Sequence, residues 1–109
     1  MVMAADQDVA ALVRRAQESG TVAVIVGFSV PDGRDDEAAI AHARAALYRA
    51  LKIEADAEGV LRGPGIGHVK SFATIPYVAM TLDAAAIGRL VQLPQITSVR
   101  ADATVTAPP

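Results

Sequence analysis

The chain has 109 residues, of which 52% are hydrophobic and 20% charged, and its formal net charge is −2. This length and apolar content predict one folded domain, and the charge lacks the basic excess that nucleic acid or an anionic membrane requires, so neither partner is expected. The absence of cysteine excludes disulfides, thiol nucleophiles and cysteine metal sites.

Residues 7–19 carry apolar side chains at helical spacing, which predicts a short amphipathic helix with Asp8 as its N-cap. Residues 21–30 are rich in β-branched side chains and end in a turn at Pro31, which predicts a strand.

A second helix is expected to run from a cap at Asp35 or Asp36 to about Lys52. Residues 54–67 combine acidic side chains with several glycines and a proline, so they predict a mobile loop without regular structure. The inward-facing stripe of the second helix is Ile40, Ala43, Leu47 and Leu51.

Residues 68–73 and 77–82 predict two strands that form a hairpin. Asp83 is expected to cap a third helix, which must end before Pro94 because proline disfavours helix in the residue ahead of it. Residues 96–105 predict the last strand.

After the N-terminal helix, the order of elements is strand, helix, strand, strand, helix, strand. Two split βαβ units of this kind predict an α+β, ferredoxin-like βαββαβ fold, with a four-stranded antiparallel sheet and two helices on one face. Residues 1–20 are interpreted as a helical extension and residues 21–109 as the main domain.

The residues that would support catalysis or cofactor binding in this fold are missing. The chain contains no asparagine for an acylphosphatase-like site, no CxxC loop for a metal carrier, and too few aromatic residues for RNA binding. The glycine-rich residues 63–67 lack the lysine of a phosphate loop. His68 is interpreted as a solvated histidine, or as a pH sensor if a partner buries it. The sequence therefore predicts no enzyme, no metal and no cofactor.

Two strands lack the alternation of apolar and polar residues that a one-sided antiparallel sheet usually shows. Their larger side chains are expected to face the helices: Val22, Val24, Val26, Phe28, Val78, Met80 and Leu82. Their smaller side chains predict an exposed, nearly uncharged face suited to binding a protein: Ala23, Ile25, Gly27, Tyr77, Ala79 and Thr81. The alternatives are self-association through the sheet, or cover by the N-terminal helix.

Several segments resemble the propeptide, or I9-type inhibitor domain, of subtilisin-like serine proteases. They are SGTVAVIVGF at residues 19–28, VKSF at 69–72, IPYVAMTL at 75–82 and ITSVRAD at 96–102. The resemblance covers residues 20–109. It implies an inhibitor and intramolecular chaperone that lays its open sheet face on two surface helices of the protease and sends its C-terminal tail, residues 103–109, through the substrate cleft.

The resemblance also assigns roles near the C-terminus. Asp102 matches acids that, in the family, cap the N-termini of the two protease helices, whereas Arg100 and Ala101 fall where some relatives carry further acids. The implied cleft-binding residues are Thr104, Val105, Thr106, Ala107 and Pro108. Pro108 in the primary specificity pocket would place Val105 in an apolar pocket upstream.

The family implies a secreted or periplasmic location beside a protease that is bound in cis or in trans. The N-terminal residues, with Asp6 and Asp8, do not predict a signal peptide, and no apolar run is long enough to cross a bilayer. The alternative function is a ferredoxin-like regulatory or scaffolding domain that pairs with a copy of itself or binds a small metabolite.

Overall fold

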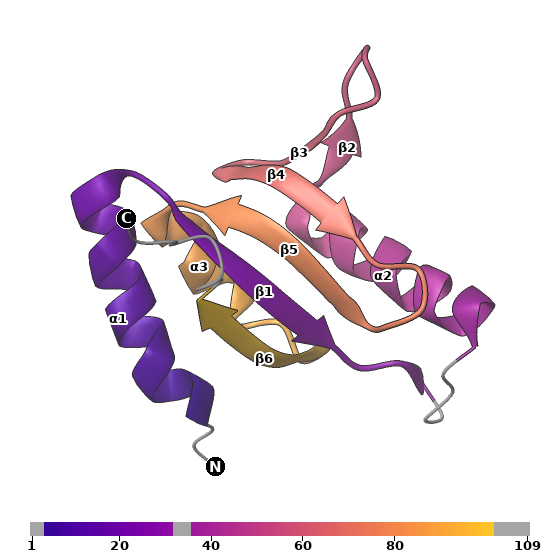
Figure 1. The fold of residues 1–109 in the computed structure, drawn as a ribbon, viewed down its shortest axis with the longest axis horizontal. Coiled ribbons are helices and arrows are strands. Elements are labelled where there is room, and N and C mark those ends of the chain that lie inside the picture. The colour runs from indigo at the N-terminus through magenta and orange to yellow at the C-terminus, as the bar shows by residue number, and fades with distance from the viewer. Residues whose placement is uncertain (1–3, 32–35, 102–109) are drawn as a thin grey trace, which may run out of the picture.

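The computed structural model describes residues 4–31 and 36–101, which form an α+β fold with a four-stranded antiparallel sheet (Figure 1). The helices are α1 (Ala4–Ser19), α2 (Glu37–Leu51) and α3 (Ala84–Leu90). The strands of the main sheet are β1 (Val22–Phe28), β4 (Ile66–Ser71), β5 (Tyr77–Leu82) and β6 (Ile96–Ala101). Their order is β4-β5-β1-β6, so β1 and β5 are central while β4 and β6 form the edges.

The caps of α2 and α3 are the aspartates that the sequence indicated. The Asp36 carboxylate accepts a hydrogen bond from the Ala39 N–H at 3.1 Å, and that of Asp83 accepts one from the Ala86 N–H at 2.8 Å. Both bonds satisfy amide groups that the first turn of a helix leaves free. The predicted inward stripe of α2 is confirmed, because its buried residues are Ile40, Ala43, Leu47 and Leu51.

Helix α1 begins at Ala4, so Asp8 lies inside the helix and the prediction that it caps the helix is wrong. Leu12 and Ala16 are buried in the same hydrophobic cluster as the sheet and the other two helices. Helix α1 packs against α3 and β6. It therefore shares the core of the main domain, and it does not cover the other face of the sheet.

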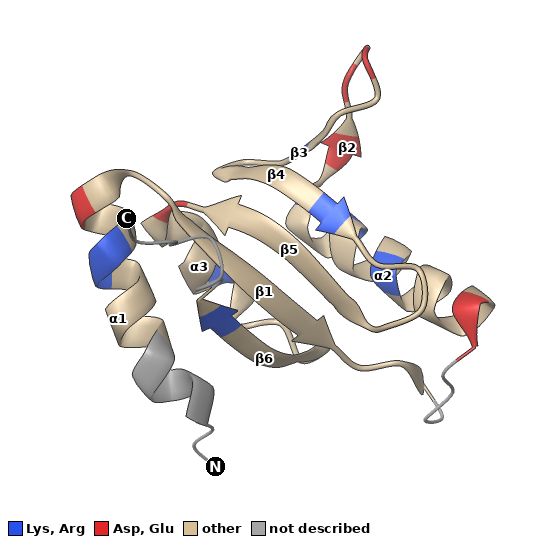
Figure 2. Ribbon diagram, in the orientation of Figure 1, with Lys and Arg blue, Asp and Glu red and all other residues tan. Residues whose placement is uncertain are grey.

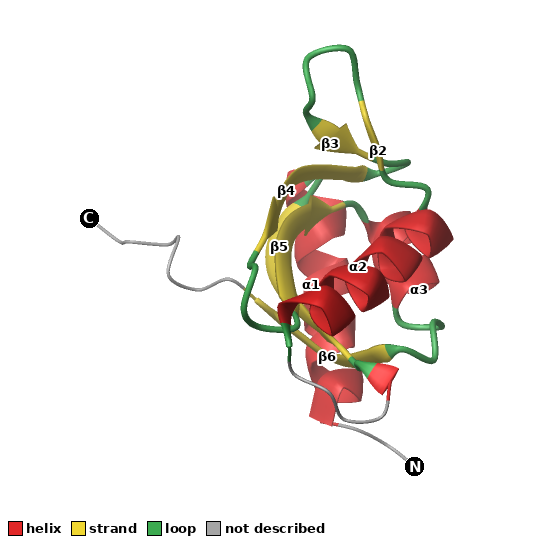
Figure 3. Cartoon of the chain, turned by 90° about the vertical axis from the view of Figure 1, so that its right-hand side faces the viewer, coloured by secondary structure: helices red, strands yellow, loops and turns green. Residues whose placement is uncertain are grey.

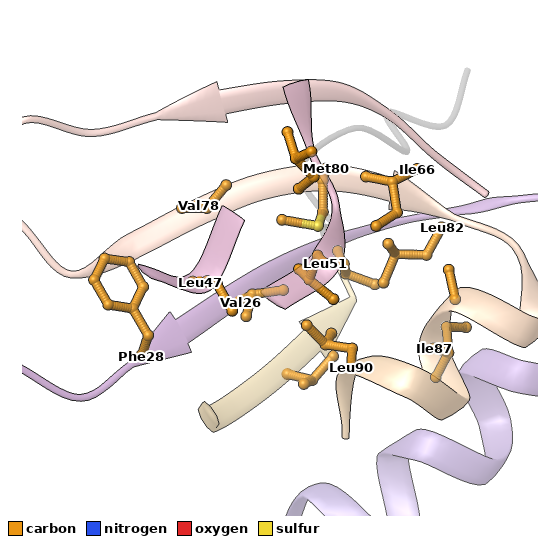
Figure 4. Packing of buried hydrophobic residues seen from close by; sticks show 14 of the residues in the cluster. Val26, Phe28, Leu47, Leu51, Ile66, Val78, Met80, Leu82, Ile87 and Leu90 are labelled. Atoms are coloured by element: carbon orange, nitrogen blue, oxygen red, sulfur yellow. The ribbon is translucent and has the colours of Figure 1, made fainter. Parts of the chain in front are cut away.

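The larger side chains of β1 and β5 face the helices, as predicted (Figure 4). They meet the apolar sides of α2 and α3, where Leu47, Leu51, Ile87 and Leu90 are almost fully buried. Burying such side chains is the main favourable contribution to folding. The buried sheet residues are Val22, Val24, Val26, Phe28, Val78, Met80 and Leu82.

Residues 54–67 are not the irregular loop that their composition indicated. They contain a small hairpin of β2 (Glu54–Ala55) and β3 (Leu61–Arg62). The Asp56 carboxylate closes the turn by accepting hydrogen bonds from the amides of Glu58, at 2.8 Å, and Val60, at 3.0 Å. These bonds, with the nearby Arg62 guanidinium, hold the pKa of Asp56 below its ordinary value of 3.8.

Strand β4 also starts earlier than predicted, at Ile66 in place of His68, and it ends at Ser71. A tight turn at Gly65, whose φ is +71°, leads into it, and the Gly65 carbonyl accepts a hydrogen bond from the Asp83 amide at 3.0 Å. The pairing with β5 shifts between Gly67 and Lys70, which marks a β-bulge. Strand β6 is described to Ala101, and the rest of the predicted last strand lies outside the described residues.

Gly65→Ala is expected to destabilise the domain by about 2 kcal/mol, because it adds left-handed backbone strain and pushes on the α3 cap. An alanine Cβ there would lie 2.5 Å from Asp83 Oδ1. Gly59→Ala is the matched control, since Gly59 also has a positive φ, +83°, but nothing lies within 4 Å of its Cβ position. Urea denaturation should show the larger loss for Gly65→Ala, and equal losses would mean that the contact with Asp83 has no cost.

Candidate protein-binding face

The structure brings the six predicted face residues together on the side of the sheet opposite the helices. They form three directly opposed pairs between β1 and β5: Ala23 with Thr81, Ile25 with Ala79, and Gly27 with Tyr77. All three helices lie on the other side of the sheet (Figure 3). We call the side free of helices the open face, which comprises Ala23, Ile25, Gly27, His68, Lys70, Tyr77, Ala79, Thr81, Ser98 and Arg100.

The predicted residues differ in how much they expose. Tyr77 is 40% exposed and Ile25 and Ala79 are half-buried, but Gly27 is buried. A Cβ at Gly27 would lie 2.6 Å from Ser98 Oγ and 3.0 Å from the Tyr77 ring. Ser98 is the residue of β6 that lies opposite Gly27, and Tyr77 is the one of β5. The side chains of Ser98 and Tyr77 therefore cover Gly27, which offers no contact surface of its own.

The open face is not as uncharged as the sequence indicated. Lys70 of β4 lies opposite Ala79, Ala79 lies opposite Ile25, and Ile25 lies opposite Arg100 of β6. These four residues form one row across all four strands, with an exposed cation at each end and apolar residues between. None of the four strands contains Asp or Glu (Figure 2).

The contact that Ser71 makes on β4 indicates which way its neighbour Lys70 points. Ser71 Oγ lies 3.1 Å from Tyr48 Oη of α2, so Ser71 faces the helices and its neighbour Lys70 faces the open side. Lys70 Nζ lies 6.0 Å from the centre of the Phe72 ring. The register shift before Lys70 sets this orientation, and the sequence carries no clear signal for it. The position of Arg100 could have been inferred, because it follows the buried core residue Val99.

At the β6 edge, Arg100 borders a hollow of about 490 Å³ that α1 also lines. Arg15 of α1 is exposed and lines the same hollow, so two arginines border it. A guanidinium binds a carboxylate through two parallel N–H···O bonds. This edge therefore has the chemistry to receive an acidic side chain.

His68 is the histidine of the open face. His68 Nδ1 lies 3.3 Å from Thr81 Oγ1 at the surface. Among the side chains that the structure describes, no three of His, Asp or Glu gather as possible metal ligands. None of the helices in residues 4–31 and 36–101 has the length and apolarity needed to span a membrane.

The predicted helix-capping acid Asp102 and the predicted cleft-binding residues lie outside the described residues, so their roles stay predictions. Those tail residues are Thr104, Val105, Thr106, Ala107 and Pro108. No protein-family model matches the chain, and neither a curated protein nor a solved structure matches it.

Proposed function

We propose that this chain is an inhibitor and intramolecular chaperone, a propeptide of ferredoxin-like fold, for a subtilisin-like serine protease. It binds the protease through the open face and places its C-terminal tail in the substrate cleft. The catalytic residues belong to the protease, so the chain acts by binding and needs no cofactor.

The observation that carries this proposal is the apolar centre of the open face. Ile25, Ala79 and Ala23 are small or aliphatic side chains on two central strands, and none of the helices α1, α2 and α3 packs over them. A one-sided antiparallel sheet normally turns polar residues toward water. An apolar strip in this position favours a surface that a protein partner covers.

The arrangement of the elements supports the finer fold assignment. The order β4-β5-β1-β6, with α2 connecting β1 to the β4–β5 hairpin and α3 connecting β5 to β6, agrees with two split βαβ units. The four segments that resemble I9-type propeptides overlap β1, β4, β5 and β6, which are the four strands of the main sheet.

The proposed mechanism has two parts. A face of ordinary interface size, about 800 Å² per partner, contributes apolar burial, and an extended tail adds main-chain hydrogen bonds in the cleft. Together they would have to supply about 12 kcal/mol for nanomolar inhibition. As a chaperone, the domain would hold two protease helices in place before distant strands of the protease pair.

The charges on the open face argue against the alternative of self-pairing through the sheet. Two copies packed face to face with aligned strands would bring Lys70 and Arg100 against the same cations of the second copy. The four strands carry no acid to balance them. Such like-charge contacts are unfavourable, so a different partner is favoured.

The purified domain should inhibit a subtilisin-like protease competitively and leave trypsin-like enzymes active, because the sheet contact depends on helices that only the subtilisin fold presents. Steady-state peptide hydrolysis with increasing domain concentration measures this. If several subtilisin-like proteases hydrolyse the peptide at an unchanged rate in the presence of micromolar concentrations of the domain, the proposal is contradicted.

Removing residues 104–109 should weaken inhibition by more than tenfold while the sheet stays folded, because the core ends at Val99 and Ala101. The inhibition constant and the circular dichroism spectrum are the two measurements. A truncated domain that inhibits as well as the full chain would remove the tail from the mechanism.

A further inference from the structure

The two cations of the open face lie at opposite ends of one row of residues, and this arrangement indicates which charges a partner surface needs. The row Lys70–Ala79–Ile25–Arg100 is continuous in register across the sheet. Its two cations, Lys70 and Arg100, lie on the two edge strands. Their backbones are three inter-strand spacings apart, which is about 14 Å. The strip between them is apolar.

The cations of the open face and of its β6 edge are not paired with acidic side chains of the described residues. Within the described parts of the chain, neither Lys70, Arg100 nor Arg15 forms an ion pair. Covering such a cation with a neutral or basic surface would remove it from water without compensation, which is costly. Covering it with a carboxylate provides a charge-assisted hydrogen bond.

We propose that the open face docks on an acidic surface: an apolar strip flanked on both sides by Asp or Glu. One carboxylate meets Lys70, and the other meets Arg100 at the β6 edge, where Arg15 lines the same hollow. This inference rests on the proposed function for the identity of the partner, and it adds the chemistry of the protease surface. A second copy of the chain does not fit, because its sheet offers no carboxylate.

The test compares two double variants that lose the same charge. Lys70→Gln/Arg100→Gln removes the cations of the row. Arg14→Gln/Arg49→Gln is the matched control, because both arginines are exposed and each lies two positions from buried helix residues, on the outer side of α1 or α2. The probe is a panel of subtilisin-like proteases inactivated at the nucleophilic serine, and the measurement is Kd by surface plasmon resonance at about 0.05 and 0.5 M salt.

The row variant should bind at least tenfold more weakly than the natural chain at low salt and lose most of the salt dependence, while the control stays within about threefold. Equal affinity of the two variants, with the natural chain still binding, would contradict the inference that the partner surface is acidic. It would not contradict the proposed function. Failure of the natural chain to bind any protease in the panel would overturn both. If the row variant self-associates while its protease affinity is unchanged, the inference is also contradicted. The cations would then serve to prevent pairing between the edge strands of two copies.

Discussion

Ala79→Glu is expected to reduce affinity for a subtilisin-like protease at least a hundredfold while the domain stays folded. Ala79 lies at the centre of the open face, opposite Ile25 on one side and Lys70 on the other. In the free domain the new carboxylate faces water and lies across from a lysine, so the change in stability should stay within about 1 kcal/mol. In the complex the same carboxylate is buried, which costs several kcal/mol.

Two control variants separate the effect of the new charge from the effect of its position in the domain. Ala79→Gln has nearly the same size without the charge and should lose less affinity, whereas Ala45→Glu places a carboxylate on the exposed side of α2 and should change neither binding nor folding. Isothermal titration calorimetry and thermal melts of the three variants measure both effects. Normal binding by Ala79→Glu would show that the sheet is not the interface.

Met80→Glu is expected to do the opposite and unfold the domain. Met80 is the next residue along β5, but its side chain points into the core among Ile66, Leu51 and Leu82, and it is 2% exposed (Figure 4). An ionised carboxylate there would be buried without a partner, at a cost comparable to the whole stability of a small domain. The circular dichroism melt should lose its cooperative transition.

Met80→Leu is the matched control, because it conserves volume and apolarity and should cost less than about 1.5 kcal/mol. A cooperative melt for Met80→Glu near that of the natural chain would show that the two faces of the sheet are exchanged. Together with Ala79→Glu, this pair tests the assignment of adjacent residues on one strand to opposite environments.

The core was predictable from the sequence because it depends on periodicity. The stripe of α2 from Ile40 to Leu51 and the alternation of β5 from Tyr77 to Leu82 both follow directly from the spacing of apolar side chains. The caps at Asp36 and Asp83 were predictable for a similar reason, since an acidic residue just before an apolar helical pattern has a local partner in the first turn.

The features that the sequence did not reveal depend on single hydrogen bonds or on register. In the turn of the β2–β3 hairpin, the Asp56 side chain accepts hydrogen bonds from two amides, which composition alone does not indicate. The position of Lys70 on the open face depends on the bulge before it, and Gly27 is crowded by Ser98 of β6 and Tyr77 of β5, which are distant in the sequence. Alternation cannot locate an extra residue in a strand.

The most direct test of the open face as the protease-binding surface is a methyl NMR titration of the labelled domain with an inactivated subtilisin-like protease. The methyl signals of Ala23, Ile25 and Ala79 should shift or broaden, while those of Ala45 and Ala50 on the exposed side of α2 stay unchanged. Changes confined to α2, with the three open-face residues unaffected, would contradict the assignment of the interface.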